Sequence, residues 1–159
     1  MTNKEAFFNA IRAGNLEKIK ALSNSNPELK NSLDERGSTP LILATYYEQE
    51  EITDFLLENG VAVDSKDGSG NTALMGVCFK GYIAIAEKLI AKGANVNHIN
   101  SMGATCLIYA ATFNRLDIAK LLLEYGADAN IKDARGQTAL DHAKMQEANP
   151  LIELLEKHS

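Results

Sequence analysis

Three histidines and two cysteines are the residues of this sequence that could take part in nucleophilic, acid–base or metal chemistry. They are His98, His142, His158, Cys78 and Cys106. Zinc sites need such ligands at short regular spacings, and these five residues show no such spacing. Asp141 directly precedes His142, but adjacent residues on a helix point away from each other, so no acid–base dyad is expected there. The sequence therefore predicts no catalytic residue, no metal site and no cofactor.

The segment Gly68-Ser69-Gly70 is rich in glycine, as phosphate-binding loops are. Phosphate-binding loops of that kind follow a strand and precede a lysine, and neither condition holds here. We therefore interpret the segment as the tip of a turn. Cys78 and Cys106 have no base close by in the sequence, so we expect small buried core residues rather than reactive thiols.

The composition is that of a soluble globular domain. The chain of 159 residues has a net charge of −5, with 45% apolar and 23% charged residues. A negative chain without clustered Lys or Arg is not expected to bind nucleic acid. Apolar runs are only a few residues long, whereas a membrane-spanning helix needs roughly 20. Glu5 stands where a signal peptide would have its apolar segment, so we expect a cytoplasmic protein with no membrane segment.

The elements that must position any functional side chain follow from a repeat with a period of 33 residues. Glycine recurs at positions 37, 70, 103 and 136, and threonine recurs two residues later at 39, 72, 105 and 138. Leucine then recurs at 41, 74, 107 and 140, and a small apolar residue at 44, 77, 110 and 143. Columns that stay in phase without an insertion predict a stack of equivalent units.

Each column has a physical reason. Glycine supplies the positive φ of a turn, and the threonine hydroxyl caps the helix that starts next. Pro40 suits the first helical position because the N–H that it lacks has no partner there. Leu41 and Ala44 share one face of that helix, which we expect to point into the core. A second helix, predicted over 52–59, 83–92 and 116–124, ends before Gly60, Gly93 and Gly126.

The segment Gly-Ser-Thr-Pro-Leu at 37–41 and the loops Gly-Ala-Asn-Val-Asn at 93–97 and Gly-Ala-Asp-Ala-Asn at 126–130 resemble motifs of the ankyrin repeat family. The resemblance covers essentially the whole chain and implies an all-α solenoid of helix-turn-helix units with β-turn or hairpin loops. It divides a single domain, 1–159, into an N-terminal capping repeat (1–33), full repeats (34–66, 67–99 and 100–132) and a C-terminal capping repeat (133–159). Asn149 and Pro150 are predicted to start the last helix as N-cap and first-turn proline.

Two positions depart from the pattern of that family. The histidine that usually follows Thr-Pro-Leu is replaced by Ile42, Met75, Ile108 and Asp141. The glycine between the two helices of a unit is replaced by Glu48 and Asn114. Asparagine tolerates a left-handed backbone, whereas glutamate does so poorly, so we expect the unit that contains Glu48 to be the most strained.

The resemblance also implies where a partner binds, because in this family the turn tips and first helices line a concave groove. Carried over position by position, the groove of this chain contains Arg36, Tyr46, Tyr47, Phe79, Lys80, Met102, Thr112, Phe113, Arg135 and Met145. The four rings among them would form an aromatic stripe across three units, and aromatic side chains are enriched at binding hot spots. Arg36, Lys66, Lys80, Lys132 and Arg135 would flank the stripe and suit a partner that presents apolar side chains among acidic ones.

Two interpretations of the aromatic stripe stay open, a partner-binding surface and packing between neighbouring first helices. For the protein as a whole, the sequence favours a non-enzymatic protein–protein interaction module, an adaptor or inhibitor, that binds an unidentified partner protein as a monomer. The alternatives are a homo-oligomeric scaffold and, less well supported, a small-molecule binder or enzyme. The last would need convergent titratable groups in a pocket.

Overall fold

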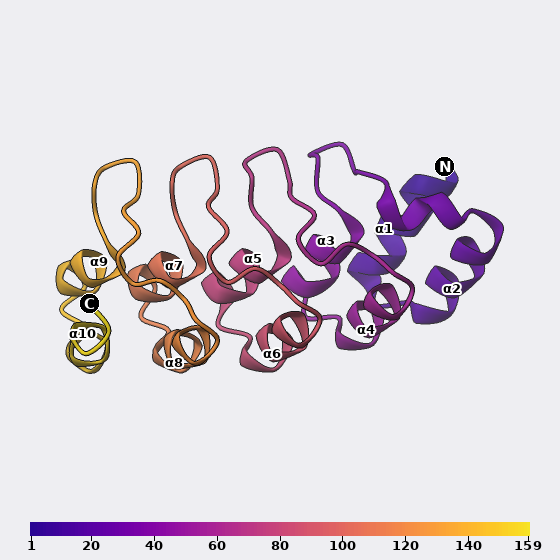
Figure 1. The fold of residues 1–159 in the computed structure, drawn as a ribbon. Helices are drawn as coiled ribbons and strands as arrows, with labels where there is room; N and C mark the ends of the chain where they lie inside the picture. The colour runs from indigo at the N-terminus through magenta and orange to yellow at the C-terminus, as the bar shows by residue number, and fades with distance from the viewer.

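A computed structural model describes residues 1–159 as ten α-helices and one 3-10 helix, with no strand. The α-helices form five pairs: α1 (Asn3–Ala13) with α2 (Leu16–Ser25), α3 (Pro40–Tyr46) with α4 (Glu50–Glu58), α5 (Ala73–Lys80) with α6 (Ile83–Ala91), α7 (Cys106–Thr112) with α8 (Leu116–Glu124), and α9 (Ala139–Met145) with α10 (Asn149–Glu156). The 3-10 helix η1 (Pro27–Asn31) follows α2. Figure 1 shows the pairs side by side in one row, which confirms the predicted all-α solenoid. No helix has the length and apolar character required to cross a membrane.

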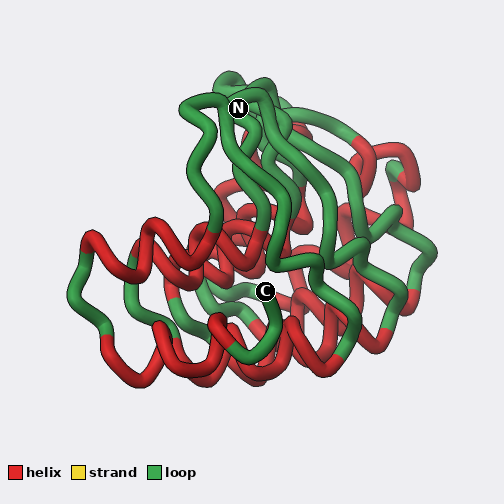
Figure 2. The backbone as a smooth tube through the Cα atoms, turned by 60° about the vertical axis from the view of Figure 1, so that its left-hand side comes forward, coloured by secondary structure: helices red, strands yellow, loops and turns green.

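The helices lie in two layers. The first helices of the pairs pack on one another in the order α1, α3, α5, α7, α9, and the second helices lie beneath them (Figure 1). The loops that join successive pairs project away from both layers, as Figure 2 shows from another direction. Each unit therefore presents a loop and the exposed side of its first helix at one common surface.

The threonine column caps the first helices, as predicted. The hydroxyl oxygen of Thr39 accepts a hydrogen bond from the backbone N–H of Ile42 at 3.0 Å, and Thr72, Thr105 and Thr138 do the same for their own helices. The predicted cap of α10 is wrong by one position. Ala148 is its N-cap and makes no side-chain bond, and Asn149 is already helical.

In the first glycine column, Gly103 serves both the turn and the stacking of the loops. Gly103 has a φ of 74°, and a Cβ added to it would lie 2.8 Å from the backbone nitrogen of Ala134 in the next loop. That same N–H donates to the carbonyl of Met102 at 3.1 Å. A side chain at this position would therefore push neighbouring loops apart.

The link between the two helices of a unit needs a left-handed residue. Glu48, Asn114 and Glu147 adopt φ values of 57°, 55° and 54° there, where Gly81 has 80°. The conformation expected at Glu48 is present, and Glu147 shares it, although the sequence pattern predicts strain only at Glu48. The left-handed backbone is unfavourable in conformational energy for both glutamates, whereas glycine adopts it freely.

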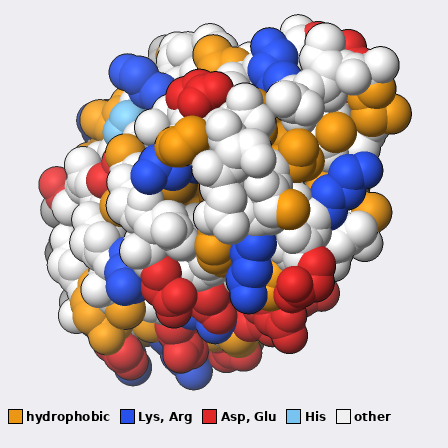
Figure 3. Space-filling view, turned by 90° about the vertical axis from the view of Figure 1, so that its right-hand side faces the viewer, with side chains coloured by type: hydrophobic (Ala, Val, Ile, Leu, Met, Phe, Trp, Pro, Cys, Tyr) orange, Lys and Arg blue, Asp and Glu red, His pale blue; other side chains and the backbone are white.

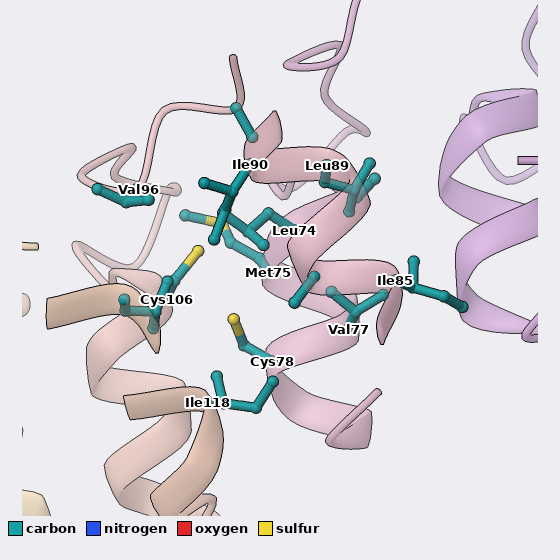
Figure 4. Packing of buried hydrophobic residues seen from close by; sticks show 14 of the residues in the cluster. Leu74, Met75, Val77, Cys78, Ile85, Leu89, Ile90, Val96, Cys106 and Ile118 are labelled. Carbon is teal, nitrogen blue, oxygen red and sulfur yellow. The ribbon is translucent and has the colours of Figure 1, made fainter. Parts of the chain in front are cut away.

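One cluster of 38 buried apolar residues runs from Phe7 to Leu155, so the units share a continuous core. Figure 4 shows part of it, with the sulfur atoms of Cys78 and Cys106 turned toward each other between α5 and α7. Both cysteines are fully buried, as predicted, and burial raises the pKa of the Cys78 thiol well above its ordinary value. At the N-terminal end of the row, polar and charged side chains surround separate apolar patches (Figure 3).

Candidate functional site

Two neighbouring hollows are lined by first helices and by the loops that precede them. The central hollow has a volume of about 330 Å³ and is lined by Ile42, Tyr46, Asp67, Asn71, Thr72, Met75, Gly76, Phe79, Tyr109 and Phe113. The N-terminal hollow has a volume of about 460 Å³ and is lined by Arg12, Asp34, Glu35, Arg36, Ser38, Ile42, Leu43, Tyr46, Tyr47 and Asp67. Because they share Ile42, Tyr46 and Asp67, the two hollows form one groove that extends from α1 to α7.

All four rings of the predicted aromatic stripe lie at the surface, with exposed fractions from 37% for Phe79 to 46% for Tyr47. Phe79 packs edge to face on Phe113 of the next unit, with 4.6 Å between ring centres. Tyr46 and Tyr47 pack in the same manner at 5.7 Å. The rings therefore contact one another and also leave apolar surface exposed to solvent, so both interpretations of the stripe stay open.

The groove carries charges of both signs. Arg36 lines the N-terminal hollow, and the ammonium nitrogen of Lys80 lies 4.7 Å above the ring centre of Tyr46. Asp34, Glu35 and Asp67 also line the hollows. The expectation of a partly basic groove thus needs a correction, because acidic residues of the loops face the same surface as the basic ones.

The remaining predicted groove residues lie outside both hollows. They are Met102, Thr112, Arg135 and Met145. The hydroxyl of Thr112 donates to the carbonyl of Ile108 at 2.8 Å, so its hydrogen bond is made within α7. The structure therefore brings together Arg36 and the four rings, with Lys80 at their edge, and leaves these four residues apart.

Several groove residues were not predicted, namely Ile42, Asp67, Gly76 and Tyr109. Tyr109 precedes Phe113 by four residues and Gly76 precedes Phe79 by three, and such neighbours share one face of a helix. That spacing is the signal that could have identified them. Gly76 also deepens the hollow, since a Cβ added to it would have Tyr46 Cδ2, at 4.0 Å, as its nearest neighbour.

The three histidines lie apart, His98 in the loop before α7, His142 in α9 and His158 after α10, and each has a partner of its own. His98 Nε2 lies 2.9 Å from the carbonyl oxygen of Gly70, and His158 Nδ1 lies 2.9 Å from that of Leu154. His142 Nε2 lies 2.8 Å from Asp133 Oδ2. This bond, with two from backbone N–H groups, lowers the pKa of Asp133 below its ordinary value. No group of three or more His, Cys, Asp or Glu side chains is placed to hold a metal ion.

Stacked helix pairs with projecting loops and a shared core define a helical-repeat solenoid. Family models of ankyrin repeats match most of the chain: ankyrin repeats (3 copies) at residues 2–67, ankyrin repeat at 69–101, and ankyrin repeats (many copies) at 89–143. The chain belongs to the ankyrin repeat family. Ankyrin repeats are generally protein–protein interaction modules and typically have no enzymatic activity. No curated protein matches the chain.

Proposed function

We propose that this protein is a non-enzymatic binding module that holds a partner protein in the groove formed by the two hollows, as an adaptor or inhibitor. The observation that carries the proposal is the cluster of exposed rings in that groove. Tyr46, Phe79 and Phe113 line the central hollow and keep more than a third of their surface in solvent. Contiguous exposed apolar surface framed by polar groups is typical of interaction sites.

The extent of the groove supports a protein partner rather than a small molecule. The groove runs past the first helices α1, α3, α5 and α7 and is open to solvent along its length. A partner that covered it could bury on the order of 1,200–2,000 Å² in total, the usual size of a specific protein interface.

The test compares the wild-type protein with the double variant Tyr47→Ala/Phe113→Ala. Both proteins are crosslinked in lysate of the native cell, and the captured partners are identified by mass spectrometry. We expect the double variant to lose the specific partner while its helical circular dichroism and its unfolding midpoint stay near those of the wild type. Tyr47 and Phe113 are suited to this test because they have the largest exposed fractions of the four rings, 46% and 40%.

Tyr125→Ala is the matched control, since Tyr125 is an aromatic residue with 59% exposure at the end of α8 and lies outside both hollows. Retention of the same partner by the double variant would contradict the proposal. Unfolding of the double variant would assign the rings to the packing of the solenoid. Sedimentation of the purified protein at micromolar concentration tests the proposed monomer against a homo-oligomeric scaffold.

A further inference from the structure

The loops that precede α3, α5, α7 and α9 are built around the same acid or amide. The residues are Asp34, Asp67, Asn100 and Asp133, and the Oδ1 of each accepts hydrogen bonds from two backbone N–H groups of its own loop at 2.9–3.0 Å. This shared arrangement closes the turn. It leaves the second polar atom of each side chain available for another partner.

That second atom has a partner within the protein in three of the four loops. Asp34 Oδ2 pairs with the guanidinium of Arg12 at 3.1 Å, and Asp133 Oδ2 lies 2.8 Å from His142 Nε2. Asn100 Nδ2 donates to the hydroxyl of Tyr109 at 2.8 Å. Asp67 Oδ2 has no partner, and Asp67 lines the central hollow.

The difference from the α7 and α9 units follows from one glycine, whereas Asp34 is reached by Arg12 of α1 and has Leu43 at the equivalent position. Tyr109 and His142 stand nine residues after the loop acid or amide that they contact. The residue nine positions after Asp67 is Gly76, which has no side chain to offer. The position that a side chain fills in α7 and α9 is therefore part of the central hollow in α5.

We propose that the central hollow binds an arginine side chain of the partner protein. The guanidinium donates to Asp67 Oδ2, as the guanidinium of Arg12 does to Asp34 Oδ2, and lies against the rings of Phe79, Tyr109 and Phe113. This inference rests on the proposed function and names the chemistry that the groove recognises.

The negative charge of Asp67 and the aromatic rings that line the central hollow favour arginine over other side chains. A carboxylate of a partner would be repelled by Asp67, and an apolar side chain would remove water from Asp67 without replacing its hydrogen bonds. A guanidinium is weakly hydrated, stacks on aromatic rings and donates in a plane, so it matches an acid beside aromatic walls. Lys80 lies over Tyr46 and outside the lining of the hollow, which leaves the other three rings for the guanidinium.

The experiment selects a phage-displayed library of random 12-residue peptides on the wild-type protein. The enriched peptide is then synthesised, and its affinity is compared with that of versions in which each arginine is replaced by citrulline or lysine. Citrulline keeps the shape of arginine and removes its charge. We expect one arginine to be essential, with a loss of about 10- to 100-fold in affinity on replacement by citrulline, as for a charge-assisted hydrogen bond.

Two variants of the protein locate that arginine. Asp67→Asn keeps Oδ1 for the loop, as Asn100 does in the next unit, and should lose a similar factor in affinity with an unchanged unfolding midpoint. Gly76→His should fill the hollow and pair with Asp67, as His142 does with Asp133, and so weaken the same peptide. Asp117→Asn, the same charge change at an exposed residue of α8, should bind normally.

The possible negative results distinguish failure of the arginine site from failure of the proposed function. Enriched peptides that depend on Tyr47 and Phe113 but contain no essential arginine, or that accept lysine equally well, would overturn the arginine site and leave the proposed function intact. Equal binding to Asp67→Asn and to the wild type would also overturn it. If the library yields no peptide that depends on those two rings, both the proposed function and the arginine site fail.

Discussion

The α5/α6 and α9/α10 units have the same loop and helix-cap contacts and differ at the residue of the first helix that lies beside the loop aspartate. In both, a loop aspartate holds its turn through Oδ1, and a threonine caps the first helix. In the last unit His142 closes the space beside Asp133, whereas Gly76 leaves the space beside Asp67 open. The comparison indicates that the shared loop and cap contacts specify the stack, while in these two units one position of the first helix decides whether the space beside the loop aspartate is filled from within or open to a ligand.

Removal of the loop aspartates should have the largest effect. Asp133→Ala breaks two bonds to backbone N–H groups and the pair with His142, and we expect it to cost about 3 kcal/mol of unfolding free energy. Asp67→Ala breaks only the two backbone bonds and should cost about 2 kcal/mol. Chemical denaturation measures both values. Equal losses would mean that the pair with His142 adds nothing to stability.

An exchange of the residues beside the two loop aspartates, His142 and Gly76, should reverse the difference between the units. His142→Gly removes the pair with Asp133 and places glycine in α9, for an expected loss of about 2 kcal/mol. Gly76→His makes the opposite change in α5 and should stabilise by up to about 1 kcal/mol, because the helix loses a glycine and Asp67 gains a partner. Denaturation of the two variants tests this exchange. Destabilisation by Gly76→His would show that the space beside Asp67 does not accept a side chain.

The loop, cap and core positions of the repeat could be predicted from the sequence because each is determined by the backbone or packing requirement of its own short segment. Threonine caps and the left-handed glycines follow from backbone requirements, and the helix predicted at 116–124 has those bounds in α8. The predicted cap of α10 is wrong because the second helices keep the 33-residue register as well, with N-caps at Gln49, Tyr82, Arg115 and Ala148. The aromatic stripe could be predicted because it follows the repeat.

The central hollow could not be predicted in the same way. Its cause is the lack of a side chain at Gly76, and the importance of that lack depends on Tyr46 and Tyr109 in the neighbouring units. The sequence of a single unit contains no pattern that connects Asp67 with these residues. The signal lies between units: the residues nine positions after the loop acid or amide are Leu43, Gly76, Tyr109 and His142, and glycine alone among them has no side chain.

Acid should weaken the closed unit through Asp133. The pKa of this carboxyl is lower in the folded protein than its ordinary value, mainly because of the bond from His142. The stabilisation is therefore complete above the unfolded pKa, about 4, and is lost as the pH falls through the lower pKa of the folded state. In His142→Ala the pKa of Asp133 should rise toward its ordinary value, and the acid-induced loss of stability should shrink.

The measurement is an NMR titration of the Asp133 side-chain carboxyl carbon, together with unfolding curves at neutral and acidic pH. His158→Ala is the control, since the ring of His158 bonds a backbone carbonyl and no carboxylate. An Asp133 pKa that is the same in His142→Ala and in the wild type would show that the backbone N–H groups alone set it.

The smallest expected difference lies in the link between the two helices of each unit. Gly81 meets the left-handed geometry of the α5/α6 link at no cost, whereas Glu147 adopts it at a φ of 54° in the α9/α10 link. Glu147→Gly should therefore leave stability unchanged or raise it by up to about 1 kcal/mol, since the relief of strain is partly offset by the extra freedom of glycine in the unfolded chain. Gly81→Ala should lower stability by about 1 kcal/mol, since alanine is strained at a φ of 80° and its Cβ would lie 3.1 Å from Arg115 Cδ. A marked loss of stability in Glu147→Gly would show that the glutamate side chain makes a contribution larger than the strain of its backbone.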